Sequence, residues 1–284
     1  MAAKRVVVCS AGAALFLLAF AVVAVETQLP PRSDCPRGRL PAYAHNDYLS
    51  AHPLSDALSF GYQGAEADVF LVDGVLQLGH ERRAAEQDGN FETLYLAPLR
   101  TLVAQCGTLT ADGRPFLLTV EIKETSRATF DTLIAVLARY PDVFAPDDSP
   151  SVARATAPVR AVLVGWYPPG FADSISFPLS RQARIQRVDG PPADAADPAV
   201  GLISFDYSAT IGRWWTTPWR RRQWLSTIRA TKAAFPRQTI RALHVPVSER
   251  KYRELLAAGV DLIGTVELAE TARLLGGITA RAQK

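Results

Sequence analysis

The chain has 284 residues, of which 48% are hydrophobic and 21% are charged. This composition is typical of a globular protein, and the length is sufficient for one large domain with a full core or for two small ones. The net charge is only +3, and no long run of basic residues is present. The composition therefore favours a folded globular protein and gives no indication of nucleic-acid binding.

The N-terminus has the pattern of a secretory signal. Lys4 and Arg5 precede an uncharged apolar segment at residues 6–25, and Val22-Val23-Ala24 supplies a small-residue cleavage site. The same segment is long enough to cross a membrane as a helix. We therefore expect residues 1–25 to be either a cleaved signal peptide or a retained membrane anchor. The mature protein is then secreted, periplasmic or held on the outer face of a membrane.

A proline-containing linker is expected at residues 26–39, followed by one domain at residues 40–284. Beyond the apolar segment the chain has two cysteines, Cys35 and Cys106. In an exported protein these two residues form either one disulfide or two unpaired thiols, and the sequence leaves both possibilities open.

The domain reads as apolar strands that alternate with helices. We expect strands at residues 39–44, 64–71, 116–122, 159–166, 183–188, 201–207, 239–245 and 261–266. We expect helices at residues 52–60, 93–106, 129–140, 218–235, 249–258 and 267–275, and a short returning strand at 75–78. Continuously apolar strands are buried on both faces of a parallel sheet. Eight such units favour an α/β fold of the (β/α)₈ TIM-barrel type over a doubly wound sheet.

Residues 44–81 carry the strongest chemical signal. Glu66 and Asp68 lie two positions apart on an expected strand, so both carboxylates project from the same face. Two carboxylates at the end of a buried strand are costly unless a cation compensates them. Oxygen ligands of this kind suit Mg²⁺ or Ca²⁺, and we expect one such divalent cation as cofactor.

The same block resembles a known enzyme family. The pieces are His45-Asn46-Asp47, Gly64-Ala65-Glu66-Ala67-Asp68-Val69, Asp73-Gly74 and Gly79-His80-Glu81. This arrangement is similar to the glycerophosphodiester phosphodiesterases, which belong to the superfamily of phosphatidylinositol-specific phospholipase C. The His-Asn-Asp-Tyr start and the Gly-Val-Asp-Leu-Ile ending resemble most closely the branch of proteins like altered inheritance of mitochondria protein 6.

The resemblance implies a TIM barrel and a set of site residues. It implies His45 and His80 as general base and acid, and it adds Glu121 as a third metal ligand to Glu66 and Asp68. A lysine common in the family matches Lys123, which is expected to contact phosphate. The remaining expected substrate-binding residues lie near strand ends or beside His45: Asn46, Trp166 and Arg241. Core packing is an equal possibility for the tryptophan.

The chain also departs from the common pattern. The first site usually reads His-Arg-Gly, and here it reads His45-Asn46-Asp47; the second usually reads His-Asp, and here it reads His80-Glu81. The missing arginine contacts phosphate in better-known members, so the departure places glycerophosphodiester specificity in doubt.

Three functions are compatible with these residues. The leading interpretation is a monomeric, metal-dependent phosphoric diester hydrolase that acts on a glycerophosphodiester or phospholipid-type substrate. The second is a non-catalytic envelope protein that binds phosphate or a lipid head group on the same barrel; the paired histidines argue against it, since binding alone requires neither an acid nor a base. The third, a glycosidase-like use of Glu66 and Asp68, is disfavoured because residues i and i+2 lie too close together to flank a glycosidic bond.

Overall fold

A computed structural model describes residues 35–36, 38–85, 89–144, 157–171, 179–185, 196, 199–211 and 218–282. The strands are β1 (Ala42–Ala44), β2 (Gly64–Val72), β3 (Val75–Leu78), β4 (Phe116–Ile122), β5 (Val159–Gly165), β6 (Leu179–Ile185), β7 (Val200–Asp206), β8 (Thr239–Leu243) and β9 (Leu262–Thr265). The helices are α1 (Ser55–Ser59), α2 (Ala97–Cys106), α3 (Arg127–Leu137), α4 (Tyr207–Ile211), α5 (Pro218–Ala234), α6 (Glu249–Ala257) and α7 (Leu268–Ala282), with short turns η2 (Asp47–Leu49) and η3 (Glu92–Leu96).

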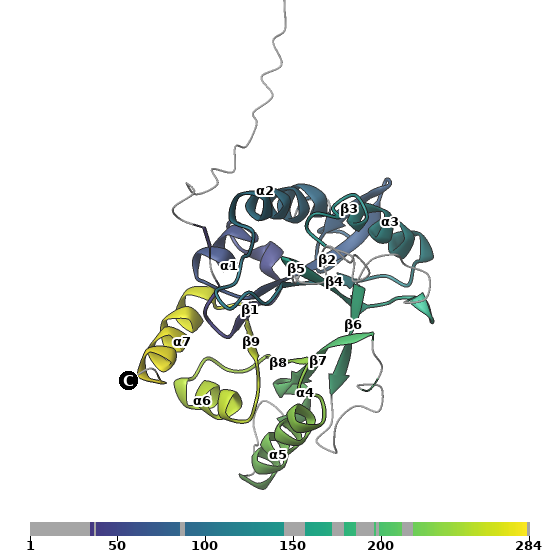
Figure 1. The fold of residues 1–284 in the computed structure, drawn as a ribbon. Helices are drawn as coiled ribbons and strands as arrows, with labels where there is room; N and C mark the ends of the chain where they lie inside the picture. The colour runs from purple at the N-terminus through teal and green to yellow at the C-terminus, as the bar shows by residue number, and fades with distance from the viewer. Residues whose placement is uncertain are drawn as a thin grey trace, which may run out of the picture.

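The strands form a closed ring. In the described part of the chain, eight parallel strands pair in the order β1-β2-β4-β5-β6-β7-β8-β9, and β9 pairs with β1. β3 is antiparallel to β2 and lies outside the ring as the second arm of a hairpin. The helices surround the ring (Figure 1). The predicted TIM-barrel fold is therefore confirmed.

The core has two parts, because neighbouring residues of each strand point to opposite faces. Leu118 and Val120 of β4 belong to the large cluster beneath the helices, whereas Leu117 belongs to a small cluster inside the ring. The interior cluster consists of Tyr43, Leu117, Val162, Leu202 and Leu262. The inward face of β4 continues from Leu117 through Thr119 to Glu121, and thus changes from apolar to charged toward the C-terminal end of the strand.

Gly64 makes room for this interior packing. A Cβ atom at position 64 would lie 2.8 Å from the Tyr43 ring and 2.7 Å from the Leu117 carbonyl oxygen. Such contacts are shorter than side chains tolerate, so a residue without a side chain is required here. Gly64 starts the strand that carries Glu66 and Asp68, and its lack of a side chain lets Tyr43 pack directly beneath those carboxylates.

The segment that precedes the barrel is tied to it covalently. Cys35 and Cys106 form a disulfide with a Cα–Cα distance of 5.7 Å, which settles the alternative that the sequence left open. Gly38 N–H also donates a 2.8 Å hydrogen bond to the Leu109 carbonyl. None of the helices within the described ranges is both long and apolar enough to span a membrane. The predicted signal or anchor at residues 1–25 lies outside those ranges.

Several elements differ from the sequence-based expectation, and two of them show the cause. β6 runs from Leu179 to Ile185 rather than over 183–188, because its register is set by pairing with β5 and β7. Helix α7 continues past Gly276 and Gly277 to Ala282, beyond the predicted end at 275. Ile278 is partly buried and packs against the main core, and this contact offsets part of the cost of two helical glycines.

Candidate active site

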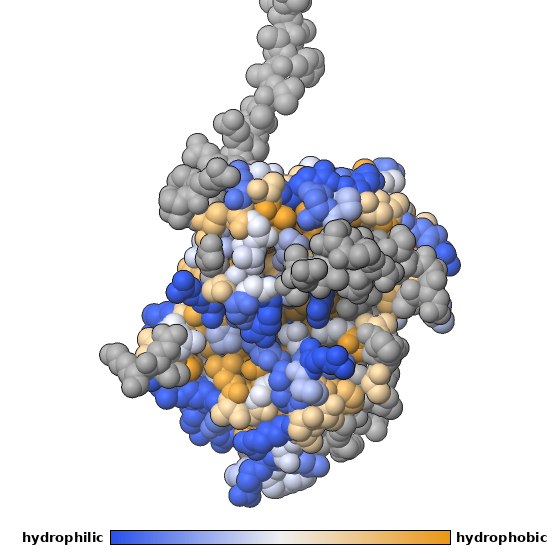
Figure 2. Space-filling view, viewed as in Figure 1, coloured by the Kyte–Doolittle hydropathy of each residue, from blue (hydrophilic) through white to orange (hydrophobic). Residues whose placement is uncertain are grey.

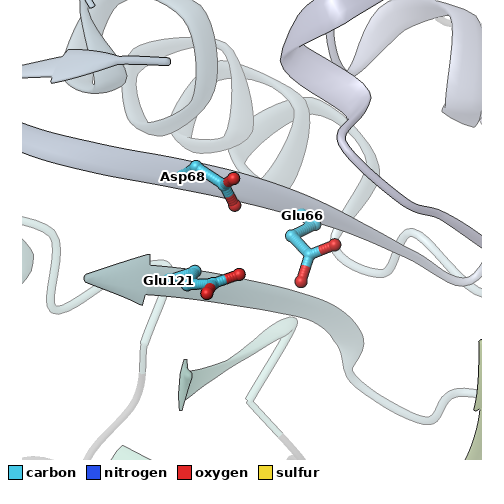
Figure 3. A group of neighbouring side chains, drawn as sticks. All are labelled: Glu66, Asp68 and Glu121. Atoms are coloured by element: carbon cyan, nitrogen blue, oxygen red, sulfur yellow. The ribbon is translucent and has the colours of Figure 1, made fainter. Parts of the chain in front are cut away.

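Three carboxylates meet at the C-terminal end of the barrel. Glu66 and Asp68 project from β2, and Asp68 is paired in register with Glu121 of neighbouring β4. One oxygen from each of the three side chains lies within 4.8 Å of the others. Figure 3 shows the carboxylates pointing toward one another from the two strands. The structure thus brings together all three residues that were predicted to bind metal.

The arrangement suits a divalent cation. Oxygen ligands bind Mg²⁺ at about 2.0–2.1 Å and Ca²⁺ at about 2.3–2.6 Å, so ligand atoms on one ion are separated by at most about 5 Å. The Oδ1 atom of Asp68 is buried and has no hydrogen-bond partner among the described residues. Burial and then the neighbouring charge of Glu66 raise the pKa of Asp68, and this is partly offset by Lys123, Tyr48 and His80. A bound cation would offset the repulsion between Asp68 and Glu66 and would give Asp68 Oδ1 a partner.

His45 lies against the first carboxylate. Its Nε2 is 3.3 Å from Glu66 Oε2, and its side chain is only 15% exposed. The Asn46 N–H points at the same Glu66 oxygen from 3.4 Å. Asn46 has φ of 52°, and asparagine is one of the few residues that adopts this left-handed conformation readily. The residue after His45 therefore turns the chain at the barrel mouth and directs its backbone N–H to Glu66.

Arg241 supports Glu66 from below. Its side chain is completely buried, with Nη1 3.8 Å from Glu66 Oε1 and Nε donating to Ser204 Oγ at 3.0 Å. The guanidinium also lies 4.3 Å from the centre of the Tyr43 ring. These contacts place a permanent positive charge inside the barrel beneath the carboxylates. Substrate binding by Arg241, expected from its place near a strand end, stays a prediction.

His80 lies against the second carboxylate. Its Nδ1 is 3.1 Å from Asp68 Oδ2, and its ring is 59% exposed. Tyr48 donates its hydroxyl hydrogen to the same Asp68 oxygen at 2.9 Å. Lys123 Nζ lies 3.3 Å from Asp68 Oδ2 and 3.4 Å from Glu121 Oε1. Each of the two predicted catalytic histidines is therefore held by a different predicted metal ligand.

A buried aspartate holds the loop that carries His45. Asp47 accepts hydrogen bonds from the Leu54 N–H at 2.6 Å and from the Tyr95 hydroxyl at 2.8 Å. Burial raises the pKa of Asp47 to about 6, although both hydrogen bonds act in the opposite direction. In this sequence His45 contacts the site carboxylate, Asn46 makes the turn and Asp47 anchors the turn.

A further histidine lies at the mouth, directly after β8. His244 Nδ1 is 3.1 Å from Asp206 Oδ1 at the end of β7. The His244 ring meets the His45 ring edge to face, with 5.0 Å between the ring centres. Both residues lie near the ends of expected strands, 201–207 and 239–245, but neither was among the predicted site residues.

Two more residues complete the comparison with the sequence. Tyr48 was missed, although its position three residues after His45 is a usable signal. Trp166 is partly buried and packs against the main hydrophobic core, the alternative that the sequence left open. In the space-filling view of the face in Figure 1, side chains fill the ring and hydrophilic residues lie over its middle (Figure 2).

Comparisons with known proteins agree with this arrangement. Residues 38–114 match the model of the AIM6-like phosphodiesterase domain. The altered inheritance of mitochondria protein 6 homolog of Arthroderma benhamiae is 35% identical over 79 residues, which cover 25% of this chain and 25% of that protein. The altered inheritance of mitochondria protein 6 of Eremothecium gossypii is 28% identical over 166 residues, or 52% of this chain and 42% of that protein. The matched region therefore spans less than half the length of either relative.

A solved structure shares the fold over a longer range. The crystal structure of a glycerophosphodiester phosphodiesterase from Agrobacterium tumefaciens covers 84% of this chain and 100% of its own, with a TM-score of 0.52 and 14% identity. At this identity the likeness shows the barrel alone. The predicted resemblance is confirmed: the first part of this chain is similar to AIM6-like phosphodiesterases, and most of the chain has the barrel of a glycerophosphodiester phosphodiesterase.

Proposed function

We propose that the protein is a metal-dependent phosphoric diester hydrolase that acts on a glycerophosphodiester or phospholipid-type substrate. One observation carries the proposal: three carboxylates converge closely enough to hold a cation, and two of them each contact a histidine. A protein that only binds phosphate has no need for two imidazoles placed beside the cation site. The site also lies at the C-terminal ends of the barrel strands, where TIM-barrel enzymes carry out their chemistry.

Each residue has a defined task in this proposal. Glu66, Asp68 and Glu121 hold the cation, which when bound offsets the negative charge that develops at phosphorus. His45 accepts the proton of the attacking hydroxyl group, and His80 donates a proton to the leaving oxygen. Glu66 and Asp68 orient the two imidazole rings through the contacts of 3.3 Å and 3.1 Å.

Lys123 and Tyr48 assist the His80 side of the site. Lys123 Nζ is within 3.5 Å of His80 Nδ1 as well as close to two carboxylates, so it carries positive charge to the place where the phosphate is expected. The Tyr48 hydroxyl lies 3.4 Å from the same His80 nitrogen. In this proposal Lys123 contacts a phosphate oxygen and Asn46 contacts the substrate beside His45.

The cellular setting is part of the proposal. The basic and apolar N-terminal pattern at residues 1–25 supports export, with the barrel acting outside the cytoplasm or on the outer face of a membrane. A phospholipid-type substrate fits this setting. We also propose that the barrel works as a monomer.

Turnover of phosphodiesters by the purified full chain tests the proposal. The substrates are glycerophosphodiesters, lysophospholipids and bis(p-nitrophenyl) phosphate, each with Mg²⁺ or Ca²⁺ and again with chelator. His45→Ala is expected to reduce kcat by about 10²–10⁴-fold, the usual contribution of a general base. His52→Ala is the matched control, because His52 is 75% exposed on the surface and pairs with Asp56 rather than with a site residue.

The panel also separates the proposal from its alternative. Metal-dependent turnover that is lost in His45→Ala and kept in His52→Ala supports the hydrolase, and the preferred substrate begins to define the head group. Tight cation binding with no turnover of any diester would instead support the non-catalytic envelope binding protein.

A further inference from the structure

The barrel mouth also contains the Asp206–His244 pair, which has no role in the proposed hydrolysis. Asp206 ends β7 and His244 follows β8, so two neighbouring strands deliver the pair to the same end of the barrel as Glu121. His244 is 40% exposed and can reach a ligand in the mouth. Its ring lies edge to face against the ring of His45, with the centres 5.0 Å apart.

Asp206 is fixed independently of His244. Its Oδ1 accepts hydrogen bonds from the Ser208 hydroxyl at 2.8 Å and from the Ala209 N–H at 3.0 Å. Partial burial raises the pKa of Asp206, but the hydrogen bonds from His244, Ala209 and Ser208 outweigh burial and hold the pKa below its usual range. His244 is therefore oriented by a carboxylate that is ionised and cannot easily rotate.

The pair is also independent of the cation site. The carboxylates that hold His45 and His80 are Glu66 and Asp68, which the proposed cation would occupy. Asp206 is outside that carboxylate group, so its negative charge stays available to His244 when the cation is bound. His244 is thus paired with a carboxylate that is not one of the three expected metal ligands.

The backbone at His244 is held in an uncommon conformation. Its φ is 53°, in the left-handed region that residues other than glycine rarely adopt. Strained backbone of this kind persists where the surrounding structure imposes it, and it is often found at functional sites. Here the left-handed conformation turns the chain directly after β8 and places the imidazole at the mouth beside Asp206 and His45.

We propose that His244, held by Asp206, binds an anionic phosphodiester oxygen as an imidazolium on the His45 side of the site. This inference rests on the proposed function and names a substrate-binding residue for it. The titratable groups that face His244 are Asp206 from β7 and His45 from the end of β1. Asp206 offsets the positive charge of the imidazolium, whereas a protonated His45 would oppose it. Histidine side chains in general change charge between pH 5 and 8, so a comparison of binding at pH 6 and pH 8 measures whether the charge contributes.

His244→Asn tests this assignment with little disturbance of the fold. Asparagine accepts the left-handed backbone conformation, and its amide can still donate to Asp206, but it carries no charge. The matched control is His52→Asn, which removes a histidine from an exposed His–Asp pair whose aspartate, Asp56, is not one of the site residues. The probe is bis(p-nitrophenyl) phosphate, whose single negative charge does not change between pH 6 and 8. The KM, the kcat and the Kd from calorimetry are measured at both values.

Loss of a charge-assisted hydrogen bond is expected to raise the KM and the Kd of His244→Asn by about tenfold at pH 6, with a smaller change at pH 8 and kcat largely kept. Asp206→Asn is expected to change both constants in the same direction. Unchanged KM and Kd in His244→Asn, or a loss confined to kcat, would overturn the assignment. If no diester is hydrolysed at all, the Kd still tests His244, so failure of the hydrolase proposal and failure of this inference are distinguishable.

Discussion

The inner wall of the barrel changes from apolar to charged within a few residues, and each charged residue there has a partner. Leu117, Thr119 and Glu121 follow one another on the inward face of β4. Thr119 bonds the hydroxyl of Tyr43, whose ring in turn lies under the Arg241 guanidinium. Arg241 supports Glu66 from below. The charged layer at the mouth thus rests on a polar layer that offsets part of its desolvation cost.

Asp47 is expected to make the stability of the protein depend on pH. Burial raises its pKa to about 6, above the value near 3.9 expected in the unfolded chain. The folded state therefore binds the proton more tightly, and the stability that this supplies is complete below about pH 4 and is lost as the pH rises through about 6. Asp47→Asn keeps an oxygen acceptor for Leu54 and Tyr95 but does not titrate.

The free energy of unfolding of Asp47→Asn, relative to the natural chain, is expected to rise by about 2–3 kcal/mol between pH 4 and pH 7. Urea denaturation at a series of pH values measures this difference. Asp131→Asn, which removes an exposed carboxylate from α3, is the control. A difference for Asp47→Asn that is independent of pH would show that Asp47 is not the titrating group.

The site residues were partly predictable for a simple geometric reason. Glu66 and Asp68 are two positions apart on one strand, so the sequence alone places them on one face. Tyr48 reaches Asp68 across 20 positions, and Asp206 reaches His244 across 38. Contacts of that separation depend on how the strands are ordered around the ring. The local sequence contains no such information for the Asp206–His244 pair, which is why that pair was not included in the predicted site. For Tyr48 the local signal is its position three residues after His45, but that position does not show the contact with Asp68.

Among the helices, α3 has an N-terminus that is defined by the side chain of the preceding residue, Ser126. Ser126 has an extended backbone, and its Oγ accepts a 3.2 Å hydrogen bond from the Thr129 N–H. Ser126→Ala is expected to lower the free energy of unfolding by about 1 kcal/mol. Ser248 occupies the same position at α6 but makes no capping bond through its side chain within the described residues.

Ser248→Ala is therefore expected to change stability by only a few tenths of a kcal/mol. Thermal or urea unfolding of both variants checks the contrast. Equal losses in the two variants would mean that the Ser126 bond contributes nothing beyond the general preference for serine at this position.

Elements were predictable where burial is uniform. β4 matches its expected range of 116–122, because FLLTVEI is an almost continuous apolar run that ends at charged residues. β6 is shifted, because LSRQARI has four polar residues among three apolar ones and gives no clear apolar run. Its ends are fixed by the pairing of Leu179 with Ala161 of β5 and of Ile185 with Phe205 of β7. The short helix α4 was not predicted, since it directly continues β7 without a turn residue.

At the scale of the whole molecule, closure of the barrel creates the site. β1 pairs with both β2 and β9, so the first and last strands of the barrel are brought together. This closure sets His45 beside Glu66 on one side and beside His244 on the other. Every predicted site residue then lies within or around one ring of strand ends, although the residues span positions 45–241 of the chain.

The central claim is that Glu66, Asp68 and Glu121 hold the cation on which hydrolysis depends. The most direct measurement is the turnover of bis(p-nitrophenyl) phosphate by the chelator-treated chain as Mg²⁺ or Ca²⁺ is added back. Glu121→Gln removes one carboxylate charge from the half-buried member of the group, and Glu81→Gln removes one from an exposed neighbour of His80.

Loss even of an outer partner of a metal ligand lowers metal affinity about 10–100-fold. We therefore expect Glu121→Gln to require at least about tenfold more cation for half-maximal turnover, while Glu81→Gln behaves like the natural chain. Turnover that survives complete chelation, or a Glu121→Gln variant that is activated at the same cation concentration as the natural chain, would contradict the account.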